Sequence, residues 1–143
     1  MQTRKLLYLV LIVALLLPAA ALAVAADGEE TPMWVSIVRL AYNGRSSHSP
    51  DRIVAMIHIR DADKDSVEGA EVTALWTLPD GSELEETAVT NEMGIAEFRV
   101  WAGRGVYQIC VEDVAKEGWV YDAELNLETC DVLEVTVPFS PGK

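Results

Sequence analysis

The sequence has few of the residues that most enzymes use for chemistry, with only 2 histidines and 2 cysteines among 143 residues. No Gly-x-Ser-x-Gly, His-Glu-x-x-His or Cys-x-x-Cys motif surrounds His48, His58 or the loop serines Ser46 and Ser47. Paired carboxylates for glycoside hydrolysis would need a cleft, which a domain of this size rarely forms. We therefore predict no catalytic residues and no enzymatic activity.

Positive charge is also scarce, because 11 Lys and Arg residues stand against 23 Asp and Glu residues and the formal net charge is −12. Arg4 and Lys5 precede the first acidic residue, Asp27, and without these two charges the rest of the chain carries −14. Such a field repels phosphate backbones. The sequence therefore excludes nucleic acid as a partner.

A long apolar run occurs only near the N-terminus, at 6–17, directly after Arg4 and Lys5. Pro18 ends this run, and small residues follow it. This arrangement predicts a secretory signal peptide over 1–26 that begins as an apolar helix.

Two cleavage sites of the small-x-small type are present, Ala21-Leu22-Ala23 and Val24-Ala25-Ala26, so we expect the mature N-terminus between Val24 and Asp27. The alternative is an uncleaved membrane anchor, because the apolar stretch 6–26 is just long enough to span a bilayer. No cysteine lies near the junction, which argues against a lipoprotein. We expect an extracellular, secreted protein, with the periplasm or a membrane-anchored cell-surface location as alternatives.

Both cysteines, Cys110 and Cys130, fall after the signal segment. An even number of cysteines in an oxidising compartment favours a disulfide, whereas two thiols alone make a weak metal site. We predict a Cys110–Cys130 disulfide.

No segment from 34 to 137 has a sustained helical period, which excludes a helical domain. Short alternating runs are separated by turn residues instead, and this pattern predicts an all-β fold, a seven-stranded antiparallel immunoglobulin-like β-sandwich. The sandwich is expected at 33–138, after a linker at 27–32 and before a C-terminal tail at 139–143. The predicted strands are 33–42, 53–61, 71–78, 84–90, 95–101, 106–113 and 132–137.

The alternation also assigns faces to the predicted strands. In the strand 53–61 it places Met56, His58 and Arg60 on the outer side, and in the strand 71–78 it places Trp76 in the core. The remaining segment, 114–131, is predicted to be a long loop.

Three segments resemble bacterial Ig-like and carboxypeptidase-regulatory-like domains: VEGAEV at 67–72, TNEMGIAEF at 90–98 and GVYQI at 105–109. The order and spacing of these motifs are most similar to the invasin/intimin type and to Ig-like modules appended to secreted bacterial enzymes. In the last group a Tyr-Asp-Pro segment follows this strand, whereas here Ala123 replaces the proline. The resemblance implies a non-enzymatic role in display, spacing or adhesion.

Within this resemblance, Tyr107 occupies the place of a tyrosine corner, whose hydroxyl bonds to nearby backbone. An antibody-type domain would have an inward cysteine at Ile109 and a partner in the strand 53–61, which has none. The resemblance therefore does not extend to the antibody disulfide.

An aspartate stands at every second position in Asp61, Asp63 and Asp65, as at the first ligand positions of an EF-hand loop. The pattern then fails, because Ser66 replaces the required glycine and Val72 replaces the bidentate glutamate. The two interpretations are a Ca²⁺ site and a solvated turn between strands. No other cofactor is predicted.

Three aromatic residues are candidate binding residues: Trp101 at the outer end of a strand, and Trp119 and Tyr121 in the loop 114–131. Exposed aromatics among acidic neighbours are typical of a protein hot spot or a carbohydrate platform. The alternative is that the loop folds its aromatics over one end of the sandwich. If the domain binds a partner, we expect the site in this loop and not on a sheet face.

These observations predict a secreted or cell-surface Ig-like module for protein binding, adhesion or accessory support. The alternatives are a carbohydrate-binding module that uses the loop aromatics and a calcium-stabilised structural domain. The partner is expected to be a protein or a cell-surface glycan, with a membrane involved only if the signal segment is uncleaved.

Overall fold

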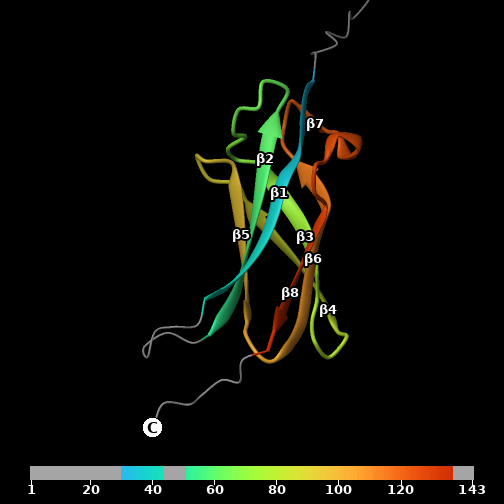
Figure 1. The fold of residues 1–143 in the computed structure, drawn as a ribbon. Coiled ribbons are helices and arrows are strands. Elements are labelled where there is room, and N and C mark those ends of the chain that lie inside the picture. Colours follow the sequence, from blue (N-terminus) through green and yellow to red (C-terminus); the bar gives the residue numbers. More distant parts are fainter. Residues whose placement is uncertain (1–29, 44–50, 137–143) are drawn as a thin grey trace, which may run out of the picture.

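The structure is a computed structural model that describes residues 30–43 and 51–136. Two four-stranded sheets lie face to face (Figure 1). The predicted signal segment 1–26, His48 and the tail 139–143 lie outside the described residues. In the part of the chain that is described, no helix is long and apolar enough to cross a bilayer.

The described residues form eight strands and one short 3-10 helix. In chain order these are β1 (Thr31–Asn43), β2 (Arg52–Asp61), β3 (Glu71–Thr77), β4 (Glu83–Val89), β5 (Ile95–Trp101), β6 (Gly105–Ala115), β7 (Trp119–Tyr121), η1 (Ala123–Leu125) and β8 (Cys130–Val135). Sheet A has the strand order β5-β2-β1-β7, and sheet B has the order β4-β3-β6-β8. The all-β prediction and the two-layer arrangement are confirmed.

The predicted number of strands is wrong, because β7 lies within the segment 114–131 that was expected to be a loop. β7 pairs with β1 in parallel, so the fold is not antiparallel throughout. Three residues are too few to show an alternating pattern, which explains why the sequence does not reveal this strand. The connection is also shorter than predicted, since β6 continues to Ala115 and β8 begins at Cys130.

The core lies between the two sheets and follows the predicted alternation. In β2, the side chains of Ile53, Ala55, Ile57 and Ile59 are fully buried, and Trp76 in β3 is also 0% exposed. Burying an indole ring requires a partner for its N–H group. The Nε1 of Trp76 donates to a carboxylate oxygen of Glu86 in β4 at 3.0 Å.

Tyr107 is buried near the start of β6, and its hydroxyl bonds to backbone as predicted. The hydroxyl accepts from the backbone N–H of Gly103 at 2.7 Å and lies 3.3 Å from the carbonyl oxygen of Trp101. Gly94, in the turn between the sheets, has a φ of +70°. A Cβ atom there would lie 2.7 Å from the carbonyl oxygen of Ile59, so the turn requires glycine for space as well as for conformation.

Cys110 and Cys130 form the predicted disulfide. They stand directly opposite each other in β6 and β8, and their Cα atoms are 4.1 Å apart. The bridge lies on the outer side of sheet B, because the neighbouring β6 residues Ile109 and Val111 point into the core. It therefore links two strands of one sheet and closes the connection that contains β7.

Candidate functional site

Two of the predicted binding residues, Trp119 and Tyr121, lie in β7 and are half-buried against the core. Their backbone pairs with the first residues of β1, Thr31 and Met33. The ammonium group of Lys116 lies 4.8 Å from the centroid of the Trp119 ring. Both rings are therefore engaged by the fold itself, which favours the interpretation that they cover one end of the sandwich.

A shallow depression of about 610 Å³ adjoins this end and is lined in part by Trp119, Tyr121 and the charged residues Glu71, Asp113 and Lys116. It is wide and open to solvent, with charges of both signs along its walls.

The segment after β7 binds the free edge of β1 through its side chains. The Oδ1 of Asn126 accepts from the backbone N–H of Val35 at 2.8 Å, and the Nδ2 of Asn126 donates to the hydroxyl of Tyr121 at 2.7 Å. The backbone N–H of Leu127 donates to the carbonyl oxygen of Val35 at 3.0 Å. Asn126 therefore takes the place of a paired strand just beyond the end of β7.

Two carboxylates continue this edge closure farther along β1. A carboxylate oxygen of Glu128 accepts from the backbone N–H of Val38 at 2.8 Å, and one from Asp131 accepts from the backbone N–H of Leu40 at 2.7 Å. Unpaired backbone donors at a sheet edge invite pairing with another chain. The acidic side chains on this connection therefore have a structural role.

The predicted calcium residues do not converge on a common point. The Oδ1 of Asp61 accepts from the backbone N–H groups of Asp63 and Asp65 at 3.0 and 2.8 Å, and thereby holds its own turn. The side chains of Asp63 and Asp65 are exposed. Within residues 30–43 and 51–136, no group of three or more His, Cys, Asp or Glu side chains is arranged to hold a metal ion. This geometry corresponds to the solvated-turn interpretation.

Trp101, the third predicted binding residue, lies at the other end of the molecule from β7. It pairs with Arg52 at the start of β2, which is itself opposite Asn43 at the end of β1, whereas Trp119 pairs with Thr31 at the beginning of β1. The two tryptophans are therefore separated by the length of β1, roughly 40 Å at 3.3 Å per residue. The structure does not bring the three aromatics into one row.

Trp101 belongs instead to the outer face of sheet A. It is 67% exposed, and the guanidinium of Arg52 lies 4.7 Å from its ring centroid. The strand registers place the following side chains on this face: Trp34, Ile37, Arg39, Ala41 and Asn43 from β1, Arg52, Val54, Met56, His58 and Arg60 from β2, and Ile95, Glu97, Arg99 and Trp101 from β5. We call this set the basic face.

The basic face combines arginine with aromatic and apolar side chains. Its four arginines are accompanied by a single acidic residue, Glu97, which forms an ion pair with Arg99. Ile37 is 42% exposed, and Met56 is half-buried at the centre. The face carries no lysine and no aspartate, although acidic residues outnumber basic ones in the chain.

His58 lies on the basic face between Ile37 and Ile95. Partial burial and, to a smaller extent, the nearby guanidinium of Arg60 lower the pKa of His58 below its usual value. The ring is therefore neutral at pH 7, and the arginines supply the positive charge of this face.

The outer face of sheet B has the opposite charge. The registers place on it the side chains Glu83, Glu85, Thr87 and Val89 from β4, Glu71, Thr73, Leu75 and Thr77 from β3, Val106, Gln108, Cys110 and Asp113 from β6, and Cys130, Val132 and Glu134 from β8. We call this set the acidic face. It contains five carboxylates and no lysine or arginine.

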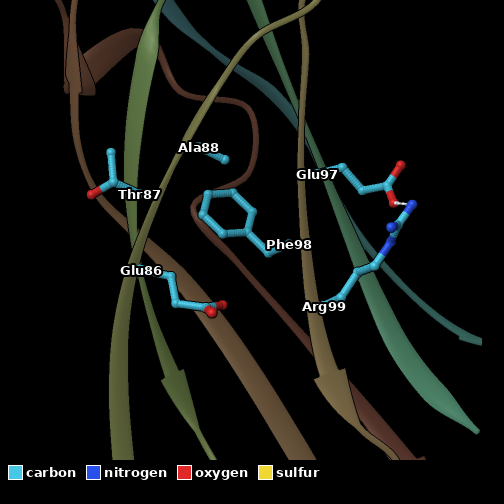
Figure 2. Close-up of a pocket in the computed structure, with 6 residues that line it drawn as sticks. All are labelled: Glu86, Thr87, Ala88, Glu97, Phe98 and Arg99. Carbon is cyan, nitrogen blue, oxygen red and sulfur yellow. Dashed lines mark ion pairs between the residues drawn. The ribbon is translucent and has the colours of Figure 1, made fainter. Parts of the chain in front are cut away.

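A groove of about 400 Å³ runs between β4 and β5, where the edges of the two sheets approach each other. Figure 2 shows the ring of Phe98 pointing between the strands, whereas Glu97 and Arg99 point together to the other side of β5. Glu86 enters the groove from β4, but its carboxylate already accepts from Trp76. The groove is therefore lined by groups that the fold itself uses.

The basic face is not among the sites predicted from the sequence, although part of its pattern is visible there. The alternation already assigned Met56, His58 and Arg60 to the outer side of one strand. Arg39 and Arg99 occupy the same side of the neighbouring strands, but only strand order and register show that they adjoin.

No family model, curated protein or solved structure matches the chain.

Proposed function

We propose that this chain is a non-catalytic, secreted or cell-surface Ig-like module for protein binding, adhesion or accessory support, and that it contacts its protein partner through the basic face. The observation that carries this proposal is the composition of that face. Protein interfaces are enriched in Trp, Met and Arg and depleted of Lys, Asp and Glu. The basic face has this composition in a chain whose overall composition is acidic.

The tryptophan and arginine side chains of the basic face support the proposal further. Binding hot spots are enriched in tryptophan and arginine. Trp101 and Arg52 stack on each other at one end of the basic face, and Trp34 lies beside Arg60 at the other. We place the binding surface on the sheet and not on the predicted loop 114–131, because Trp119 and Tyr121 are half-buried against the core.

The Ig-like assignment rests on the resemblance together with three features of the fold. These are the two facing sheets, the buried Trp76 on β3 and the Tyr107 hydroxyl bonded to backbone. A role outside the cytoplasm is supported by the Cys110–Cys130 disulfide, since such bridges persist in oxidising compartments.

Photo-crosslinking in cells that export the protein tests the proposal. A crosslinking amino acid replaces Ile37 at the centre of the basic face, and the products are identified by mass spectrometry. We expect a defined protein product that is lost when Arg39→Glu and Arg99→Glu are combined. The matched control, Arg104→Glu, removes an exposed arginine from the turn before β6 and should leave the product unchanged.

A product that forms equally in the double variant would contradict the proposed surface. Material that contains only glycan would favour the carbohydrate-binding alternative instead.

A further inference from the structure

The two outer faces of the sandwich carry opposite charges on the same chain. The basic face has Arg39, Arg52, Arg60 and Arg99 with one glutamate, and the acidic face has five carboxylates with no basic residue. The other described basic residues, Lys64, Arg104 and Lys116, lie in connections between strands. The separation of charge is therefore a property of the two sheets and not of the loops.

We propose that the basic face binds the acidic face of a second copy of this chain, so that copies associate sheet on sheet into open chains. The inference rests on the proposed binding surface and names its partner. Charge complementarity selects the partner face, and every copy carries both faces. Because the two contacting faces differ, the contact is heterologous and leaves one free face of each kind at the ends.

Apolar groups on the acidic face complement those on the basic face. Leu75 lies at its centre beside the Cys110–Cys130 disulfide. Val132 (55% exposed) follows Cys130 on the same side of β8, and Val106 (50% exposed) lies farther along the face, opposite Glu134. Two sheets that pack face to face need such apolar contacts between polar margins. Within residues 30–43 and 51–136, no helix or further sheet covers either outer face (Figure 1).

The expected contact is small. Three strands spaced 4.8 Å apart and about 30 Å long present roughly 430 Å² per copy, so the two copies together bury about 860 Å². This area is below the roughly 1,000 Å² of a stable specific interface and corresponds to weak association. Association is therefore expected only at high protein concentration, as on a surface where many copies are displayed.

The net charge of the chain opposes association at long range. At physiological ionic strength the Debye length is about 8 Å, so distant charges are largely screened. Pairs in contact are screened less, and here these are arginines against carboxylates. We therefore expect the local complementarity to outweigh the overall repulsion near 0.15 M salt.

Sedimentation analysis of the purified exported protein tests this inference, with two variants that each remove one face. The first combines Arg39→Glu with Arg99→Glu, and the second combines Glu83→Lys with Glu85→Lys. The average mass of the unaltered protein should rise with concentration beyond that of a dimer. Each variant alone should remain monomeric up to about 1 mM.

The decisive sample is an equimolar mixture of the two variants. One variant keeps an intact acidic face and the other keeps an intact basic face, so the mixture can form only one productive contact. The inference predicts that the average mass doubles and then stops increasing. Arg104→Glu and Glu92→Lys, which change charges in turns, should associate like the unaltered protein.

Three results would overturn the inference. The first is an unaltered protein that is monomeric at every concentration, the second is an average mass that still rises with concentration in either face variant, and the third is a mixture that does not dimerise. If a lysine variant does not fold, Glu83→Gln with Glu85→Gln replaces it. A monomeric protein that still crosslinks through position 37 to a different protein would refute self-association and leave the proposed function intact. Absence of both results would refute the proposed function as well.

Discussion

The β7 end of the sandwich and the basic face of sheet A each contain a tryptophan that packs against a basic side chain, but the two tryptophans differ in exposure. Trp119 is half-buried against the core beneath Lys116, whereas Trp101 is 67% exposed beneath Arg52. The β7 end is connected to β1 by backbone pairing and by side-chain acceptors, but no described segment lies over the basic face. The comparison shows that the aromatics near β7 pack against the core, whereas Trp101 on the sheet face remains exposed.

The largest loss of stability is expected at Trp76, because it is the fully buried tryptophan of the described core. Trp76→Ala should lower the free energy of unfolding by about 3–5 kcal/mol, through a large cavity and the loss of the bond to Glu86. Urea denaturation monitored by circular dichroism measures the change. A loss below about 1 kcal/mol would contradict the buried position.

The disulfide strengthens the β7 end, because it closes the segment between Cys110 and Cys130 that includes β7 and η1. Replacing both cysteines by alanine should lower the unfolding free energy by about 3 kcal/mol, since a loop of this size constrains the unfolded chain. The unaltered protein under reducing conditions provides the control. Equal stability with and without the bridge would show that β7 is held by its other contacts alone.

Comparing the unfolding free energies of Trp119→Ala and Trp101→Ala tests whether the two tryptophans have different roles. Trp119→Ala should cost about 2 kcal/mol, because half of a large ring leaves a packed environment. Trp101→Ala should cost no more than about 0.5–1 kcal/mol, the value of an exposed cation–π contact with Arg52. Similar losses in the two variants would contradict the different roles assigned to the two regions.

The edge closure of β1 can be tested by a matched pair at one position. Glu128→Ala should cost about 1 kcal/mol, because the backbone N–H of Val38 loses its acceptor. Glu128→Gln keeps an acceptor oxygen and should be nearly neutral. Glu134→Ala, on the acidic face, provides a control for the loss of negative charge, and thermal unfolding measures all three.

The smallest expected effect is the pH dependence that arises from His58 on the basic face. Its pKa is lower in the folded chain than in the unfolded chain, mainly through burial and secondarily through Arg60. As the pH falls through the usual value near 6.5, the unfolded chain therefore binds a proton first, and stability decreases until the pH passes the folded pKa. NMR titration of the ring gives the folded pKa, and His58→Gln should remove this part of the dependence.

The sequence alone determined the positions of seven strands to within about two residues, and most of the residues that fill the core. Val67, Ala70 and Val114 are core residues from outside the predicted strands. The side-chain period of a strand is two, so the runs that contain Ile57, Trp76 and Phe98 identify both the strand and its buried side without knowledge of its neighbours. Gly69 and Gly94 lie within two of the segments that carry the family resemblance, and both have a positive φ in the structure, which other residues avoid.

Only the tertiary structure decided which residues from different strands lie together. β7 is a strand because its backbone pairs in parallel with β1. Three residues are too few to show an alternating pattern in the sequence. The basic face depends on strand order, since β5, β2 and β1 bring Arg99, Arg52 and Arg39 to one side of one sheet. Local sequence determines whether a side chain points inward or outward, but long-range pairing determines which outward side chains become neighbours.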